Sequence, residues 1–183
     1  MTFLYFAYGS NMLSSRLQHK TRCPSAIKVG VATATGYQLN FSKKSNDGSG
    51  KGSLVEKTES SAIGVIFNIS KSELVALDKA EGVNFGYRRV DDFIVTTKNG
   101  KEKITTSYLP QAQYCDDQLK PYDWYIALVI AGAMEHNFSK GYLDKLKCMP
   151  IIKDPDEKRR SRINAIEALD SAGYRKWHEL LLS

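Results

Sequence analysis

The sequence contains no apolar run that approaches the length of a membrane span, so we expect no transmembrane helix. Over 183 residues, the hydrophobic share of 42% and the charged share of 25% are ordinary for one globular domain with a sizeable core. The first residues are predicted to form a strand. They have no basic region before them and no small-residue cleavage site after them, so we expect no signal peptide.

Cysteine is scarce and oddly numbered. Cys23, Cys115 and Cys148 lie far apart in the sequence. An odd number of widely spaced cysteines does not suggest a disulfide framework, and it is typical of free thiols in a reducing compartment. The sequence therefore predicts a cytoplasmic protein.

Motifs for several other kinds of chemistry are missing. The three histidines show no spacing typical of metal ligands, so we expect them at the surface or in helices. The glycine-rich segment 48–52 lacks the ending of a phosphate-binding loop, and Ser10 is not in a Gly-x-Ser-x-Gly nucleophile elbow. The net charge of +6 is modest, and the basic cluster 158–162 follows acidic residues, which favours a solvated helix face. A basic nucleic-acid-binding protein stays open as the least favoured alternative.

Hydrophobic patterning predicts strands in the first part of the chain and helices in the last. The segment 42–59 is rich in Ser, Lys, Gly and Asn, and we expect a mobile loop there, either a binding loop or lid or a plain surface excursion. The fold class is α+β, with a small bent or barrel-like mixed β-sheet flanked by helices. We expect a single domain over 1–183, with 150–183 as a helical C-terminal extension. The expected strands are 3–8, 26–34, 37–41, 62–69, 87–97 and 101–109, and the expected helices are 12–17, 70–80, 122–136, 140–148 and the part after 155.

The stretch Phe3–Met12 organises the rest of the chain. An apolar, aromatic strand stops at Gly9, and a helix then begins for which Ser10 or Asn11 is a suitable cap. Such a turn gathers unpaired backbone N–H groups at the positive end of a helix dipole, and Gly9 allows close approach of a ligand. The stretch therefore suits an anion such as a carboxylate, although an ordinary strand-to-helix connection has the same pattern.

Glu81 is the second candidate for chemistry. It lies at the expected end of a helix, before Gly82 and close to Phe85 and Tyr87. The helix dipole and an apolar setting would both disfavour the charged carboxylate and raise its pKa, which suits a general acid or base. A solvated glutamate on the last helical turn is the alternative reading.

Four segments together resemble the γ-glutamylcyclotransferase family, and their order and spacing agree from about residue 3 to about residue 147. Residues 150–183 show no such resemblance. The four segments are Tyr8-Gly9-Ser10-Asn11-Met12, Gly64-Val65-Ile66-Phe67, Leu77-Asp78-Lys79-Ala80-Glu81-Gly82 and Ser107-Tyr108-Leu109.

The resemblance implies a cyclisation that needs no metal or cofactor. The α-amine of a γ-glutamyl amide attacks the side-chain carbonyl, which gives 5-oxoproline and releases the attached amine. Glu81 would be the catalytic acid and base, and the Gly9–Met12 turn would hold the substrate α-carboxylate. Tyr5 matches the family pattern less well than the other tyrosines. The residues that the resemblance places in substrate binding are Tyr8, Gly9, Ser10, Asn11, Met12, Tyr87 and Tyr108.

The turn sequence also bears on the subtype. Asn11 followed by Met12 is nearer to the γ-glutamyl-amino-acid type and its antibiotic-pathway cousins than to the glutathione-degrading or γ-glutamylamine types. The leaving amine, the use of glutathione and the oligomeric state, a homodimer included, stay open. We expect a small-molecule substrate, with no nucleic acid and no membrane. A non-catalytic binding module of the same fold is the runner-up, although retention of Glu81 argues against it.

Overall fold

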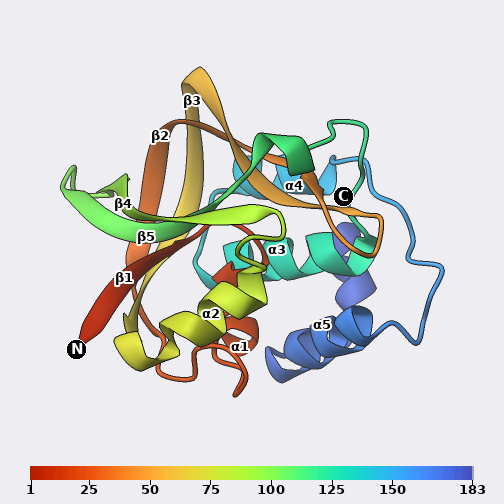
Figure 1. The fold of residues 1–183 in the computed structure, drawn as a ribbon. Coiled ribbons are helices and arrows are strands. Elements are labelled where there is room, and N and C mark those ends of the chain that lie inside the picture. The colour runs from red at the N-terminus through yellow and green to blue at the C-terminus, as the bar shows by residue number, and fades with distance from the viewer. Residues whose placement is uncertain (183) are drawn as a thin grey trace.

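The computed structural model describes residues 1–182, and within them five strands close into a barrel that has helices packed along one side (Figure 1). The order around the barrel is β1-β3-β2-β4-β5, and neighbours are antiparallel except β1 and β5, which pair in parallel at Tyr5 and Thr106. The predicted mixed, barrel-like α+β sheet is confirmed. The elements are β1 (Thr2–Ala7), η1 (Ser10–Met12), α1 (Ser14–Leu17), β2 (Ile27–Lys44), β3 (Gly50–Ser70), η2 (Lys71–Glu73), α2 (Leu74–Glu81), β4 (Tyr87–Thr97), β5 (Glu102–Pro110), η3 (Ala112–Tyr114), α3 (Asp123–Glu135), α4 (Lys140–Lys147), α5 (Arg160–Ser171) and η4 (Trp177–Leu181).

The mobile loop predicted over 42–59 is wrong, because β2 and β3 form a long hairpin arm there with a turn only at 45–49. The small residues of this segment allow close packing. A Cβ on Gly50 would lie 1.9 Å from the carbonyl oxygen of Phe41. The buried hydroxyl groups of Ser42 and Ser53 are 2.9 Å apart and hydrogen-bonded. In this segment the low apolar content therefore reflects close packing within a hairpin and not a loop.

Gly36 does not turn the chain from one strand into another. β2 continues through Gly36 without interruption, and its register with β3 shifts between Thr35 and Tyr37. Gly36 has a φ of +81°, a left-handed conformation that glycine adopts at little cost. The two strands predicted at 26–34 and 37–41 are therefore one bulged strand.

The helix predicted after the first strand is much shorter than expected. The chain forms the one-turn 3₁₀ element η1 and then the four-residue α1. Neither Ser10 nor Asn11 caps a helix with its side chain. The Ser10 hydroxyl accepts a hydrogen bond from Arg16 instead, and the Asn11 side chain extends to Glu81. Both side chains are thus used for tertiary contacts.

The segment from α2 to β5 agrees closely with the prediction. α2 ends at Glu81 because Gly82 adopts the left-handed conformation, with a φ of +66°. β4 occupies 87–97 as expected, and Asn99-Gly100 forms the turn into β5. The helix end at Gly82 and the start of β4 at Tyr87 place Glu81 and Tyr87 on either side of the short loop 82–86.

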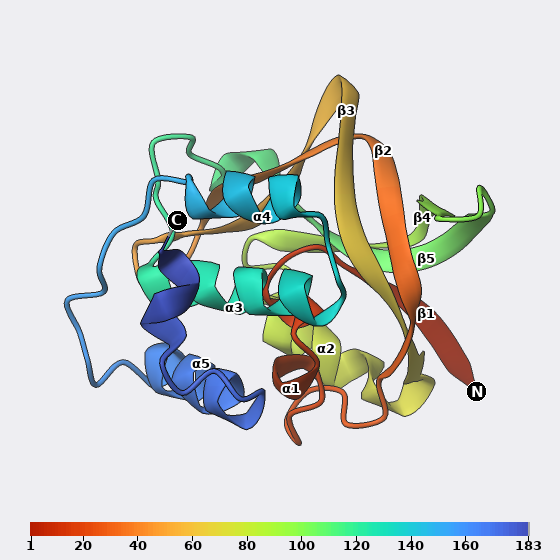
Figure 2. The same ribbon diagram turned by 180° about the vertical axis from the view of Figure 1, so that it is seen from behind.

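α3 is the central helix of the molecule, buried along nearly its whole length (Figure 2). It packs against η1, α4, α5 and η4, so the C-terminal helices share its hydrophobic core. At its N-terminal end, the indole N–H of Trp124 donates to the buried carboxylate of Asp154, 2.8 Å away. At its C-terminal end, His136 is buried rather than at the surface, and its Nε2 lies 2.8 Å from the carbonyl oxygen of Met12.

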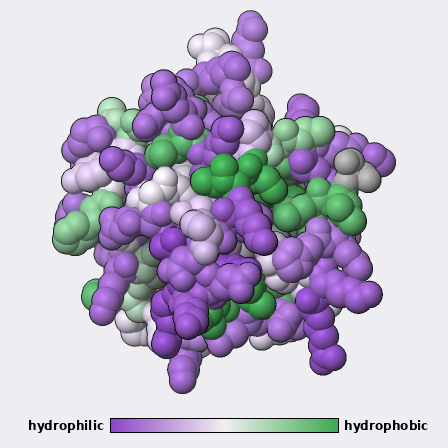
Figure 3. All heavy atoms as spheres, turned by 90° about the vertical axis from the view of Figure 1, so that its right-hand side faces the viewer, coloured by the Kyte–Doolittle hydropathy of each residue, from purple (hydrophilic) through white to green (hydrophobic). Residues whose placement is uncertain are grey.

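The face of the molecule on the side of α5 is mostly hydrophilic, with hydrophobic side chains in small, separate groups (Figure 3). No helix within residues 1–182 is both long and apolar enough to cross a membrane.

Candidate active site

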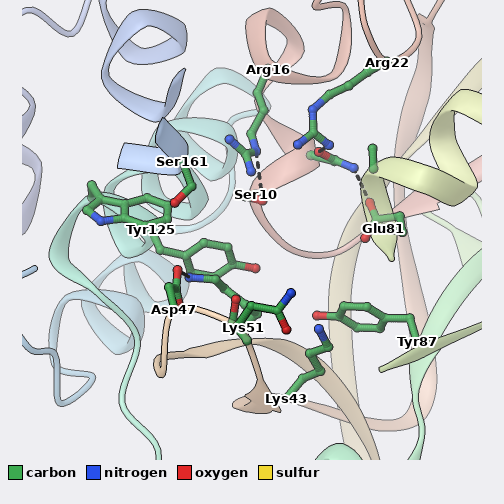
Figure 4. Close-up of a pocket in the computed structure, with 15 residues that line it drawn as sticks. Ser10, Arg16, Arg22, Lys43, Asp47, Lys51, Glu81, Tyr87, Tyr125 and Ser161 are labelled. Carbon is green, nitrogen blue, oxygen red and sulfur yellow. Dashed lines mark hydrogen bonds and ion pairs between the residues drawn. The ribbon is translucent and has the colours of Figure 1, made fainter. Parts of the chain in front are cut away.

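Two adjoining chambers open beside the η1 turn, where the barrel, α2 and α3 meet. Figure 4 shows the residues that line the larger, outer chamber. The inner chamber has a volume of about 30 Å³ and the outer chamber about 300 Å³. Tyr5, Tyr8, Gly9 and Gly52 line only the inner one. The residues that line both chambers are Ser10, Asn11, Glu81, Tyr87 and Tyr125.

The Gly9–Met12 turn presents two unpaired backbone amides at these chambers. The N–H groups of Ser10 and Asn11 donate to no backbone or side-chain acceptor within residues 1–182. The Met12 N–H is already used, because it donates to the carbonyl oxygen of Gly9 at 3.0 Å. The Met12 side chain is fully buried in the core and lines neither chamber. The part of the turn that is available to an anion is therefore Ser10–Asn11.

Glu81 is the only carboxylate common to both chambers in the described chain. Its Oε1 accepts a hydrogen bond from Asn11 Nδ2 and another from the Tyr5 hydroxyl at 3.3 Å. Burial raises the pKa of Glu81, while Arg22, Arg16, the Tyr5 hydroxyl and Lys43 act in the opposite direction. The pKa direction expected from the sequence is thus found.

The apolar setting of Glu81 comes from tyrosine rings and not from Phe85, whose side chain is 76% exposed. Tyr87, the first residue of β4, and Tyr8, which follows β1, both line the inner chamber and are buried. Their hydroxyl groups donate to the carbonyl oxygens of Gly52 and Tyr108, each at 2.5 Å. These bonds fix both rings as walls of the chamber.

Tyr108 lies behind this wall and lines neither chamber. Its ring centroid is 5.9 Å from that of Tyr5, in an edge-on arrangement. Its hydroxyl donates to Asp78 at 2.7 Å, and Asp78 is paired in turn with Arg89. Tyr108 therefore contacts the site through the Tyr5 ring and through the Tyr8 hydroxyl, which donates to its carbonyl oxygen.

Three basic side chains around Glu81 were not singled out from the sequence as site residues: Arg16, Arg22 and Lys43. Arg16 Nε donates to the Ser10 hydroxyl at 3.1 Å, and Arg22 Nη1 donates to Asn11 Oδ1 at 3.3 Å. Figure 4 shows the three side chains directed toward the chamber from different elements. For Arg16 and Arg22 the overall excess of positive charge was the only signal in the sequence, because both are far from Glu81 along the chain. Lys43 lies in the segment 42–59, for which a binding loop was one of the two readings.

The far side of the outer chamber carries an ion pair. Lys51 Nζ lies 2.9 Å from Asp47 and 4.5 Å from the centroid of the Trp124 ring. Burial lowers the pKa of Lys51 to about 8, against the attraction of Asp47. Tyr125 joins this side to the arm by accepting the Gly52 N–H at 2.9 Å, and Ser161 of α5 completes the wall. Much of the segment predicted as a loop thus does line the site, as part of a rigid hairpin.

No three His, Cys, Asp or Glu side chains gather as metal ligands in residues 1–182. The arrangement instead combines a half-buried carboxylate of raised pKa, two free amides and an excess of basic side chains. Such a site can bind an anionic substrate and move a proton within it.

Known proteins are similar to this chain in sequence and in fold. A model of the AIG2-like family matches residues 61–146. A γ-glutamylcyclotransferase of Mus musculus is 31% identical over 180 residues, covering 96% of this chain and 91% of the relative, and one of Homo sapiens is 33% identical over 81% of this chain and 79% of its own length. A solved γ-glutamyl cyclotransferase structure superposes with a TM-score of 0.80 at 29% identity, covering 91% of this chain and 99% of that one. The chain therefore belongs to the γ-glutamylcyclotransferase family.

Proposed function

We propose that this protein is a γ-glutamylcyclotransferase that converts a γ-glutamyl amide into 5-oxoproline and a free amine, with Glu81 as the general acid and base. The observation that carries the proposal is the position of the Glu81 carboxyl group. It is half-buried between two chambers, held by Asn11 and Tyr5, and next to the two free amides of the η1 turn.

The substrate would enter with its glutamyl group in the inner chamber. Its α-carboxylate would accept the N–H groups of Ser10 and Asn11, and its α-ammonium would face Glu81. Holding the carboxylate and the ammonium together folds the glutamyl chain toward its own carbonyl carbon. Orientation of this kind contributes much of the rate in intramolecular reactions.

Glu81 then moves the protons. It accepts a proton from the α-ammonium, and the resulting amine attacks the side-chain carbonyl carbon to form the five-membered lactam. The bond between that carbon and the leaving nitrogen breaks as Glu81 returns a proton to the nitrogen. The α-ammonium loses two protons as the lactam forms, and the released amine gains two protons. The overall reaction therefore consumes and releases no proton. A raised pKa suits a group that must both accept and donate near neutral pH.

The basic cluster 158–162 gives little support to the nucleic-acid-binding alternative. Arg159 Nε lies 2.8 Å from the buried carboxylate of Asp154, and Arg162 lies 3.9 Å from Glu157.

The free thiols of Cys23, Cys115 and Cys148 support the further proposal that the protein works in the cytoplasm on a free small molecule. Nothing in this arrangement selects an oligomeric state.

The test is release of 5-oxoproline from γ-glutamyl dipeptides, γ-glutamyl-lysine, glutathione and a γ-glutamyl anilide. We expect wild-type protein to act on at least one of them and Glu81→Gln to lower kcat by about 10²–10⁴-fold, the usual worth of a positioned proton-transfer group. Unchanged turnover in folded Glu81→Gln protein would remove Glu81 from the mechanism. Failure of the wild type on the whole panel would favour a binding module.

A further inference from the structure

Lys43 is a buried cation in the outer chamber without a carboxylate partner. Only 8% of the residue is exposed, and its side chain extends from β2 into the chamber beside Tyr87 (Figure 4). No carboxylate within residues 1–182 lies within 4.0 Å of its ammonium group. Lys51, on the same hairpin arm, does have such a partner in Asp47. A buried ammonium without a counter-ion is costly, and a bound anion would relieve that cost.

Two neighbours hold the Lys43 side chain in place. Its Nζ lies 4.8 Å from the centroid of the Tyr87 ring, within the range of a cation–π contact. On the other side, a Cβ on Gly86 would lie 2.3 Å from Lys43 Cε, so the lack of a side chain at Gly86 makes room for the lysine. Burial lowers the pKa of Lys43, and Glu81 and Asp47 act against that effect. The ammonium is therefore preorganised next to a ring that lines both chambers.

The charges of the site leave room for a second carboxylate. Lys51 and Asp47 cancel each other, which leaves Arg16, Arg22 and Lys43 opposite the single carboxylate of Glu81. In a γ-glutamyl amino acid, the glutamyl α-carboxylate would face the η1 turn near Arg16 and Arg22. The second carboxylate, on the leaving amino acid, would lie one residue beyond the scissile amide, on the outer side of Tyr87. Lys43 lines the outer chamber beside Tyr87, on the side where that carboxylate would lie.

We propose that Lys43 binds the carboxylate of the leaving amino acid and so selects γ-glutamyl α-amino acids over γ-glutamyl amides whose leaving group has no carboxylate. This inference rests on the proposed function and adds the determinant of substrate choice at the same site. Lys43 is a specificity residue here, because it contacts a part of the substrate that does not react.

The test compares two substrates that differ only in this charge, γ-glutamyl-alanine and γ-glutamyl-alaninamide. We expect wild-type protein to favour γ-glutamyl-alanine by about 10- to 100-fold in kcat/KM, the usual worth of a hydrogen bond to a charged group. Because Lys43 also acts on the pKa of Glu81, the measured quantity is the ratio of kcat/KM for the two substrates, and Lys43→Met should lose the preference for γ-glutamyl-alanine. A urea unfolding curve like that of wild type would show that the variant is folded. Lys43→Arg should restore part of the preference. Lys44→Met, an exposed neighbour on β2, is the matched control and should behave as wild type.

Two kinetic outcomes would overturn the proposal. One is a wild type without preference between the two substrates, and the other is an equal loss on both in Lys43→Met. Calorimetry can measure binding of the two ligands to protein that carries Glu81→Gln, with and without Lys43→Met. Because this measurement needs no turnover, it tests the role of Lys43 separately from the proposed reaction. Tighter binding of γ-glutamyl-alanine that disappears with Lys43→Met would support the role of Lys43 even if no cyclisation were seen. Equal affinities for the two ligands would refute it.

Discussion

At the scale of single residues, Glu81 experiences two opposing effects. Burial disfavours its charged form and raises its pKa, whereas Arg22, Arg16 and the hydrogen bond from Tyr5 favour the charge. Burial prevails, so the folded protein holds the proton more tightly than an ordinary glutamate with a pKa of 4.5 does. A carboxyl group whose pKa is raised on folding lowers the stability of the fold at neutral pH.

This balance predicts a pH-dependent gain in stability for Glu81→Gln. Because the pKa of Glu81 is higher in the folded state, its stabilising contribution is fully present below the unfolded pKa of 4.5 and is lost as pH rises through the folded pKa. Glutamine stays neutral and keeps an oxygen that accepts from Asn11 and Tyr5. We therefore expect urea unfolding to give a higher free energy of unfolding for Glu81→Gln than for wild type at about pH 8, with a smaller gap at about pH 4. A gap that widens toward low pH would show that Glu81 has a lowered pKa.

Some site residues followed from local patterns and others did not. The turn at Gly9 and the helix end at Glu81 follow from glycine positions and hydrophobic spacing, and the structure brings both to one pocket. Their roles stay predictions. Lys43 was not predicted as a site residue, because only the folding of the chain carries it to Glu81. Met12 and Tyr108 were predicted as site residues from the family resemblance, although their side chains line neither chamber.

At the scale of elements, the packing of α3 against η1 sets the position of the turn proposed to bind the substrate α-carboxylate. Gly132 lies in α3, three residues before the last residue of the helix, and glycine weakens a helix relative to alanine. A Cβ at Gly132 would lie 2.7 Å from the backbone nitrogen of Leu13 and 2.8 Å from Met12 Cβ. The glycine therefore allows the helix to pack directly against the backbone that follows Ser10 and Asn11.

This contact predicts opposite results for two Gly→Ala substitutions. Gly132→Ala must push α3 away from η1, so we expect it to lower the free energy of unfolding by about 1–3 kcal/mol and to raise KM by moving the Ser10 and Asn11 amides. Gly141→Ala is the matched control, because Gly141 lies in α4 with open space around it. Its better helix propensity should stabilise the protein by up to about 1 kcal/mol with KM unchanged. A Gly132→Ala protein as stable and active as wild type would mean that this contact does not position the turn.

The type of an element was predictable where the alternation of apolar and polar side chains reflects burial, as in β4. Composition was misleading where small residues are present because two backbone segments are in contact. Gly50 and Gly52 look like loop residues in the sequence. In the fold, Gly50 lies against the backbone of Phe41 and Gly52 against the hydroxyl of Tyr125. A sequence pattern does not show whether glycine provides flexibility or space for a neighbour, so the hairpin arm was not predictable.

At the scale of the whole molecule, the part after residue 149 is joined to the barrel by one continuous core. Leu169 of α5 and Trp177 of η4 belong to the same buried cluster as Phe67 of the barrel and Leu128 of α3. The buried carboxylate of Asp154 adds a polar anchor through the indole of Trp124. We propose that 150–182 is an integral layer of a single domain and not a separable extension.

That proposal predicts one cooperative unfolding transition. If the layer and the barrel unfold together, the slowest-exchanging amides of α5 and β3 should report the same free energy of opening in native-state hydrogen exchange. Urea unfolding followed by circular dichroism and by the fluorescence of Trp124 and Trp177 should give coincident curves. A lower opening free energy for α5 alone would show a separable extension. Because Ser161 lines the outer chamber, opening of α5 would also expose that chamber, so cooperative unfolding would keep it formed for as long as the protein is folded.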